Sequence, residues 1–233
     1  MARRFVDAWL RPGSRNTLEV MLRSCHELGY WGVAVELDDN SWGEVKRIAS
    51  VYGLEVFRRV TFEVGSKEEL YRRLRADRWR YDLVSVATRD RDVLMAAVRD
   101  MRVDTVVVSD PSSPPIDRHI VQVVGNSLEL ALFDLLKGGY EALRTATRIV
   151  RTVYRKGLKL VVSSGARDEY GLRSPRQIAS VAWSLGSAPD YALNTVSIFP
   201  SEMLLENRGR LEGRISVEGV WRVAKGEEEV SNG

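Results

Sequence analysis

Four arginines recur at intervals of three or four residues along one stretch of the chain, at Arg144, Arg148, Arg151 and Arg155. Because a helix has about 3.6 residues per turn, this spacing places them within an arc of roughly 60° on one side. The guanidinium group offers a planar fork of donors that suits bidentate contacts with phosphate. No acidic residue from Ala142 onward lies in the same helical segment to pair with them. The pattern favours an anion-binding face over a solvated face paired with acids of a neighbouring helix.

The charge of the chain is unevenly distributed. Its formal net charge is only +3, from 35 basic and 32 acidic residues. The segment from Ala142 to Arg167 carries seven basic residues and no acidic one, which leaves 28 basic and 32 acidic residues elsewhere. Further candidate contacts to nucleic-acid phosphates or to a protein partner are Lys159, Arg167, Arg173 and Arg176. Since no aromatic-rich segment accompanies these residues, structured nucleic-acid backbone is a better target than stacked bases.

Other groups of polar residues permit chemistry but do not point to one site. Ser163, Ser164 and Gly165 follow a predicted strand, so their amides could hold an anion or could form a plain structural turn. The arginines between Arg72 and Arg80 are mixed with Glu68, Glu69 and Asp77, which indicates a paired, solvated surface.

Catalytic patterns are sparse. The chain has only two histidines, His26 and His119, each in a predicted helix, so a multinuclear hydrolase site of the usual kind is not expected. Cys25 has no activating base beyond its neighbour, and no nucleophile elbow surrounds the serines. A metal-dependent phosphoesterase that uses carboxylates at strand ends remains the alternative. Its candidate ligands are Asp7, Glu36, Asp38 and Asp110.

The elements that must position these residues alternate between short strands and longer helices. Strands are predicted over 6–10, 31–37, 54–62, 82–87, 105–109, 128–132 and 159–163. Helices are predicted over 16–28, 42–52, 67–75, 91–101, 116–124, 140–156 and 174–185. This alternation predicts parallel strands with right-handed crossovers. The turn after the first strand lacks the glycine pattern of a dinucleotide-binding fold, which favours a barrel.

The fold class is therefore an α/β barrel of the triosephosphate-isomerase (TIM) type in a single domain, complete or one strand short. An eighth strand is not evident, because residues 189–205 read as mostly helical or irregular. We expect the barrel domain to span residues 1–208. Residues 209–233 are expected to form an extension, with a hairpin over 211–223 and a disordered acidic tail from 226.

Length and composition exclude several classes of protein and indicate a cellular location. A length of 233 residues with 44% hydrophobic content can bury a substantial core, which excludes a disordered or fibrous chain. The single cysteine cannot form an internal disulfide, and no stretch approaches the roughly 20 apolar residues of a membrane span. We predict a cytoplasmic protein with no membrane association.

Three segments together resemble a known family. They are Phe5-Val6-Asp7, the run 27–35, and the block Val161-Val162-Ser163-Ser164-Gly165-Ala166 that precedes Leu172-Arg173-Ser174-Pro175. Their order and spacing resemble ribonuclease P protein component 3, a subunit of archaeal and eukaryotic ribonuclease P, over residues 4–207. The chain departs from some relatives at Glu36-Leu37 and at Phe199-Pro200.

The resemblance implies a barrel-like subunit of the ribonucleoprotein that removes the 5′ leader of precursor tRNA. The RNA would carry the chemistry with Mg²⁺, and this chain would bind no cofactor itself. Its expected partners are ribonuclease P RNA, ribonuclease P protein component 2 and other protein subunits, with precursor tRNA in the holoenzyme. A purely structural oligomerisation module is the third hypothesis.

Overall fold

The protein is described here by a computed structural model, which covers residues 3–37 and 41–214. Seven strands form one sheet in chain order, and every neighbouring pair is parallel. They are β1 (Val6–Leu10), β2 (Gly32–Val35), β3 (Glu55–Glu63), β4 (Leu83–Ala87), β5 (Thr105–Val107), β6 (Ser127–Ala131) and β7 (Leu160–Ser163). The seven predicted strands are confirmed.

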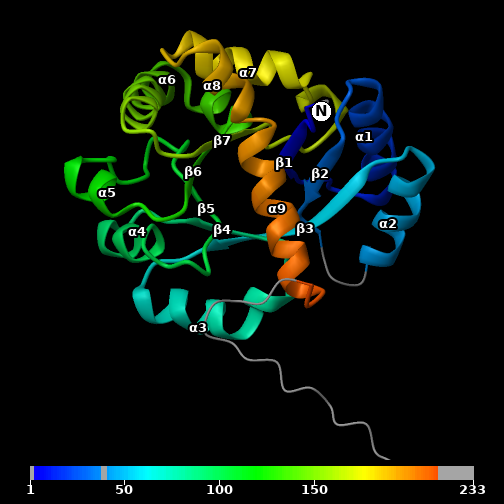
Figure 1. The fold of residues 1–233 in the computed structure, drawn as a ribbon, viewed down its shortest axis with the longest axis horizontal. Helices are drawn as coiled ribbons and strands as arrows, with labels where there is room; N and C mark the ends of the chain where they lie inside the picture. The colour runs from blue at the N-terminus through cyan, green and yellow to red at the C-terminus, as the bar shows by residue number, and fades with distance from the viewer. Residues whose placement is uncertain (1–2, 38–40, 215–233) are drawn as a thin grey trace, which may run out of the picture.

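Helices connect the strands and surround the sheet, as Figure 1 shows. They are α1 (Arg15–Glu27), α2 (Trp42–Val51), α3 (Lys67–Asp77), α4 (Arg91–Ala97), α5 (Arg118–Val123), α6 (Leu132–Arg155), α7 (Pro175–Ser184), α8 (Pro189–Asn194) and α9 (Ile198–Leu211). Short 3₁₀ turns lie at η2 (Arg78–Arg80) and η3 (Glu169–Gly171). The seven strands form a nearly closed barrel, so the predicted TIM-barrel-like fold is confirmed.

The barrel closes between β1 and β7 without an eighth strand in the described chain. The segment after α8 lies between these strands: the Val162 amide within β7 donates to the Thr195 carbonyl at 3.1 Å, and the Val6 amide at the start of β1 donates to the Val196 carbonyl at 2.9 Å. Near their carboxyl ends, the Arg11 amide donates to the Ala166 carbonyl at 2.8 Å. Closure therefore depends on a few isolated hydrogen bonds.

Helix α9 lies across the amino end of the barrel, where it passes in front of the strands in Figure 1. Its Leu204 packs with Val6 and Phe57 in a small interior apolar cluster. The Asn207 amide group donates to the Asp82 carbonyl at 2.9 Å and to Asp104 at 2.8 Å. The helix thus occupies one end of the barrel and leaves the carboxyl end accessible.

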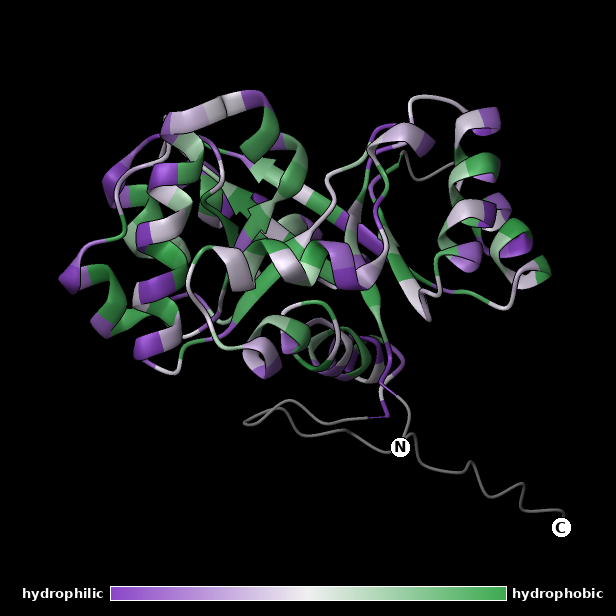
Figure 2. Cartoon of the chain, turned by 90° about the horizontal axis from the view of Figure 1, so that it is seen from above, coloured by the Kyte–Doolittle hydropathy of each residue, from purple (hydrophilic) through white to green (hydrophobic). Residues whose placement is uncertain are grey.

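The main core lies between the strands and the outer helices, and Figure 2 shows the apolar residues concentrated there. Helix α6 illustrates how the sequence produces this layer. Its buried residues Ala142, Ala146, Ile149, Val150 and Val153 recur at helical spacing, so one face packs inward and the opposite face is exposed.

Several boundaries differ from the prediction. Helix α6 begins at Leu132 and bends at Gly139, whose φ of 59° departs from helical geometry, so the predicted helix over 140–156 is its second part. Helix α9 continues past the predicted domain boundary at 208 and ends at Leu211, which also makes the first residue of the predicted hairpin helical. The rest of that hairpin from 215, and the predicted tail, lie outside the described residues. None of the described helices has the length and hydropathy needed to cross a membrane.

Candidate nucleic-acid interface

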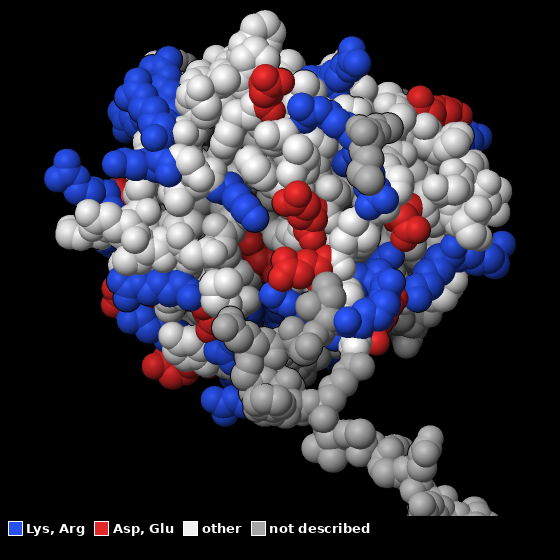
Figure 3. All heavy atoms as spheres, in the orientation of Figure 1, with Lys and Arg blue, Asp and Glu red and all other residues white. Residues whose placement is uncertain are grey.

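The four predicted arginines of α6 occupy one exposed face, which we call the α6 arginine stripe (Arg144, Arg148, Arg151 and Arg155). In Figure 3, basic side chains gather over α6 at the upper left of the molecule. Lys156 and Lys159 follow directly in the chain and are also exposed. The structure therefore brings together most of the segment that carries the excess positive charge.

The stripe is only partly neutralised by neighbours. Arg144 forms an ion pair with Glu141 at 3.0 Å, which the sequence prediction overlooked because Glu141 lies one residue before the acid-free segment. Arg148, Arg151 and Arg155 form no ion pair with any residue in the described ranges. Three exposed guanidinium groups thus keep their charge available on one helix face.

The mixed cluster on α3 and η2 is paired in part, and its buried Arg78 departs from the predicted solvated surface. Arg73 pairs with Glu69 at 3.1 Å, and the buried Arg78 pairs with Asp104 at 3.1 Å. Arg80 pairs with Asp77 at 3.1 Å. These three arginines are held by carboxylates within the chain, which leaves only Arg72 and Arg75 of the cluster exposed and without an ion pair to a described residue.

Of the two interpretations left open for the Ser163–Gly165 segment, an anion loop and a structural turn, the structure favours the turn. Ser163 and Ser164 are buried, and the Ser163 hydroxyl donates to Glu129 at 2.7 Å inside the barrel. The Ser164 amide donates to the Asp7 carboxylate at 3.0 Å, and the Gly165 carbonyl accepts from Arg11 at 2.9 Å. The segment is a structural turn, because these groups are already engaged within the chain.

The remaining predicted contacts lie in different places. Arg176 is exposed in the first turn of α7 and makes no ion pair with a described residue. Arg173 is partly buried and donates to the carbonyls of Tyr170 at 2.8 Å and Leu172 at 2.6 Å. Arg167 lies at the carboxyl end of the barrel, on a different part of the surface from the stripe.

The carboxyl end of the barrel opens into a cavity of about 820 Å³. Its charged lining consists of four basic residues, Arg11, Arg89, Lys137 and Arg167, and four acidic residues, Glu63, Asp90, Asp110 and Asp134. The two signs balance, and Arg11 lies 3.7 Å from Asp134. This cavity therefore lacks the excess positive charge that distinguishes the stripe.

Aromatic rings and guanidinium groups alternate from this cavity into the barrel. Arg167 and Arg11 lie over the Phe133 ring, at 5.1 and 5.3 Å from its centroid. Arg11 and Arg59 lie over the Trp9 ring, at 4.2 and 4.0 Å. Burial lowers the pKa of Arg11, although the nearby Asp134 carboxylate acts in the opposite direction. The stack fixes these arginines in place and reduces their freedom to reach a large ligand.

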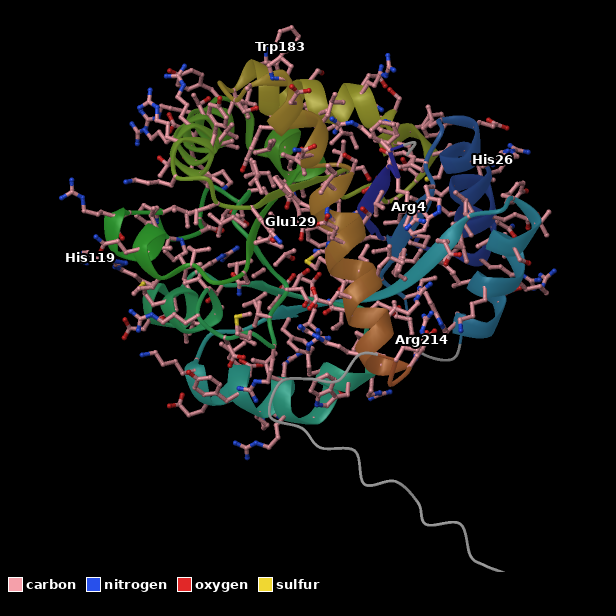
Figure 4. The ribbon with its side chains drawn as sticks, in the orientation of Figure 1. Arg4, His26, His119, Glu129, Trp183 and Arg214 are labelled. Atoms are coloured by element: carbon pink, nitrogen blue, oxygen red, sulfur yellow. The ribbon has the colours of Figure 1, made fainter. Side chains whose placement is uncertain are left out.

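Sequence reasoning missed the buried pair at the base of this stack. Arg59 and Glu129 are both fully enclosed and meet at 2.8 Å. Glu129 also accepts from Thr105 at 2.6 Å, and Figure 4 places it near the middle of the barrel. The available signal was a charged residue within each apolar strand, since strand alternation points every second side chain inward.

The carboxylates proposed for a phosphoesterase serve internal contacts. Asp7 accepts from the amides of Trp9 and Ser164, and burial raises its pKa to about 6. Glu36 accepts from the Trp9 indole at 2.6 Å. Asp110 accepts from Ser112 at the surface, which lowers its pKa, and Asp38 lies outside the described residues.

No three acidic, histidine or cysteine side chains of the described residues are grouped so that they could share a metal ion. Figure 4 also shows His26 and His119 on opposite sides of the molecule. Cys25 is buried, and burial raises the pKa of its thiol well above the usual value, which disfavours the nucleophilic thiolate. The phosphoesterase alternative is therefore not favoured.

Comparison with known proteins shows which family the chain represents. The family described as RNase P subunit p30 matches residues 4–212. The chain belongs to this family. It is a protein subunit of ribonuclease P, the endoribonuclease of tRNA maturation, as the resemblance implied.

Curated relatives of this p30 subunit carry the name ribonuclease P protein component 3. Ribonuclease P protein component 3 of Methanococcoides burtonii is 23% identical over 207 residues, which cover 84% of this chain and 85% of the relative. The protein of the same name from Methanosarcina mazei is 24% identical over 208 residues, covering 84% and 86%.

The fold of the p30 subunit is also found in a solved structure, a cryo-EM structure of archaeal ribonuclease P with mature tRNA. A chain of that structure matches with a TM-score of 0.78 and 20% identity, over 96% of this chain and 100% of that chain. The similarity extends to the whole described barrel and supports the assigned fold.

Proposed function

We propose that the α6 arginine stripe binds backbone phosphates of ribonuclease P RNA, and that the chain supports the catalytic RNA without carrying the chemistry itself. The observation that carries this proposal is the row of three exposed guanidinium groups with no ion pair to a described residue. Each such group can release a condensed counterion when it contacts a phosphate. Family membership supplies the RNA as the partner, and the stripe supplies a surface that suits it.

The proposed assembly includes further partners. We infer that protein component 2 contacts this subunit, that other protein subunits join them, and that precursor tRNA is bound by the holoenzyme. The similar chain in archaeal ribonuclease P with mature tRNA supports such an assembly. The proposal assigns the Mg²⁺ ions to the RNA, where they would stabilise the charge that develops at the scissile phosphate. A cytoplasmic location accords with the single buried Cys25.

A salt titration of RNA binding tests the stripe. The variant R148A/R151A/R155A removes three exposed charges and is compared with R72A/R75A/R118A, which removes three exposed arginines from α3 and α5. Binding of transcribed ribonuclease P RNA is measured by filter binding over a range of salt. If each stripe arginine contacts one phosphate, the slope of log affinity against log salt should fall by about 3 in the stripe variant.

In the control variant, the slope of log affinity against log salt should fall much less, although this variant loses the same net charge. Equal changes of the salt slope in the two variants would mean that the overall charge of the protein causes the effect, and would overturn the proposed interface. Unchanged RNA binding by the stripe variant, together with lost association with protein component 2, would assign the stripe to a protein contact instead. Leader removal in a reconstituted holoenzyme should weaken in the stripe variant most clearly at high salt.

A further inference from the structure

Trp183 is an exposed aromatic residue beside the α6 arginine stripe. It lies in the last turn of α7 with 58% of its surface exposed, while Ile178, Ala179 and Ala182 of the same helix are buried. In Figure 4 it lies at the outer edge of the molecule and points away from the barrel. Its exposure therefore follows from the inward packing of the opposite side of α7.

Trp183 differs from the other tryptophans of the described chain. A guanidinium group lies over the ring of each of the other four, Trp9, Trp31, Trp42 and Trp79. Trp79 is almost equally exposed, at 57%, yet Arg78 lies 5.6 Å from its ring centroid. No ring and no guanidinium group of the described residues lies against Trp183. Its indole is available for stacking with a ligand.

Two arginines lie on the part of the surface that carries this indole, Arg151 at the end of α7 and Arg176 in its first turn. Gly186 follows α7, and a Cβ atom added there would lie 2.8 Å from Nε of Arg151, so the stripe packs against the end of this helix. The Gly186 amide donates to the Trp183 carbonyl at 2.9 Å, which ties this glycine to the turn that carries the indole. Arg176 lies seven residues before Trp183 in α7, which is two turns or about 10 Å along the same face.

We propose that Trp183 stacks on one unpaired nucleobase of the bound RNA, while Arg151 and Arg176 contact phosphates on either side of that nucleotide. This inference rests on the proposed RNA-binding function of the stripe and specifies one of its contacts. A base offers a flat π-face to the indole, and stacking of this kind tolerates any base. The sequence lacks an aromatic-rich segment, so the single indole adds one stacked base to a surface that otherwise contacts the backbone.

The surroundings of Trp183 favour a nucleotide over an apolar protein partner. The other exposed residues of α7 are Arg176, Gln177, Ser180 and Ser184, all of them polar. Protein interfaces generally bury a contiguous apolar centre with few charged residues. A lone indole on a polar surface that also carries Arg151 and Arg176 suits the alternation of base and phosphate along a nucleic-acid strand.

Three RNA probes separate stacking from backbone contacts. The full chain is titrated with a short oligouridylate, with a sugar-phosphate strand of equal length that has no bases, and with an RNA duplex. Binding is measured for the unmodified protein and for W183A, W183F and W79A. Trp79 is the matched control, because it is an equally exposed tryptophan whose ring already carries a guanidinium group.

We expect W183A to bind the oligouridylate about tenfold more weakly, while its affinity for the strand without bases is unchanged. W183F should retain most of the affinity because it keeps an aromatic ring, and W79A should behave like the unmodified protein. Oligouridylate should quench part of the intrinsic tryptophan fluorescence of the unmodified protein. This quenching should be absent in W183F, because stacking on Trp183 causes it.

Two results would overturn the stacking contact. One is equal weakening of W183A on both strands, which would mean that its loss disturbs the arginines rather than a base. The other is unchanged RNA binding by W183A with reduced binding of protein component 2, which would assign the indole to a protein. Failure of the proposed stripe is distinguishable, because R148A/R155A, which keeps Arg151, would then bind all three probes normally whatever W183A does.

Discussion

Helices α6 and α9 both carry arginines, but they hold them in opposite ways. On α6, Arg148, Arg151 and Arg155 are exposed and form no ion pair with a described residue. On α9, Arg208 pairs with Glu55 at 2.8 Å and with Asp82 at 3.3 Å, and its guanidinium group lies 3.9 Å from the centroid of the Phe57 ring. Figure 3 shows the contrast on one face, where acidic side chains gather over α9 and basic ones over α6.

The difference teaches that the pairing of an arginine, rather than its presence, separates a binding surface from a structural contact. A guanidinium group that is stacked and paired within the chain would have to leave those partners before it could contact a phosphate. An exposed and unpaired group loses only water and counterions. Enclosed charges should therefore affect folding, and exposed ones should affect binding.

The enclosed pair Arg59–Glu129 should give the largest effect of this comparison. The variant Glu129→Gln leaves the guanidinium group of Arg59 buried without a carboxylate partner, so the free energy of unfolding should fall by about 3–5 kcal/mol. Urea denaturation followed by circular dichroism measures this change. Adding Arg59→Met should recover part of the loss, because no unpaired charge would then remain inside the barrel. If Glu129→Gln alone were as stable as the unmodified protein, the contrast between enclosed and exposed arginines would not hold.

A buried carboxylate should give the next effect, through pH. Burial raises the pKa of Asp7 from 3.8 to about 6 in the folded chain, so between these values the folded state binds more protons than the unfolded state. The contribution of Asp7 to stability should therefore decrease as pH rises from 3.8 to 6, by on the order of 2–3 kcal/mol.

The variant Asp7→Asn isolates this contribution, because the amide oxygen can still accept from Trp9 and Ser164. The stability of the unmodified protein relative to this variant should decline through that pH range in denaturation curves. A relative stability that rises with pH would mean that the native fold favours the ionised carboxylate.

Replacement of Arg208 tests α9 directly. Arg208→Ala removes two ion pairs and the packing on Phe57, so the free energy of unfolding should fall by about 2 kcal/mol. RNA affinity, measured at a temperature where the variant stays folded, should not change. A variant of normal stability that binds RNA weakly would place α9 in the binding surface and remove its contrast with α6.

The smallest effect on stability should come from the stripe. In R148A/R151A/R155A, each replacement should change the free energy of unfolding by no more than about 0.5 kcal/mol, because the side chains are exposed and form no ion pair with a described residue. Thermal unfolding of this variant and of Arg208→Ala under the same conditions compares the arginines of α6 and α9 directly. A large loss of stability in the stripe variant would show that these arginines are structural.

The sequence predicted the parts of the fold that depend on local patterns. Alternating strands and helices, and the single exposed face of α6, follow from periodicities of apolar residues such as Ala142, Ala146 and Val150. The pairing within α3 was also predictable, because Glu69 precedes Arg73 by one helical turn.

Contacts between distant segments could not be read from these patterns. Arg208 meets Asp82, and Asn207 meets Asp104, across more than 100 positions of the chain. The sequence left an anion loop and a structural turn open for Ser163 and Ser164, because nothing local shows that Glu129 and Asp7 already use their polar groups. Likewise, only the three-dimensional arrangement brings the end of α7, with Trp183, beside Arg151.

The incomplete closure of the barrel also has a consequence for how the chain folds. The hydrogen bond between Ser164 and Asp7 joins residues 157 positions apart, and the Thr195–Val196 segment reaches β1 from still farther along the chain. During synthesis at about 5–20 residues per second, β1 would wait roughly 10–40 s for these partners. The first strand thus completes its pairing last, and closing the ring becomes a late, non-local step in folding.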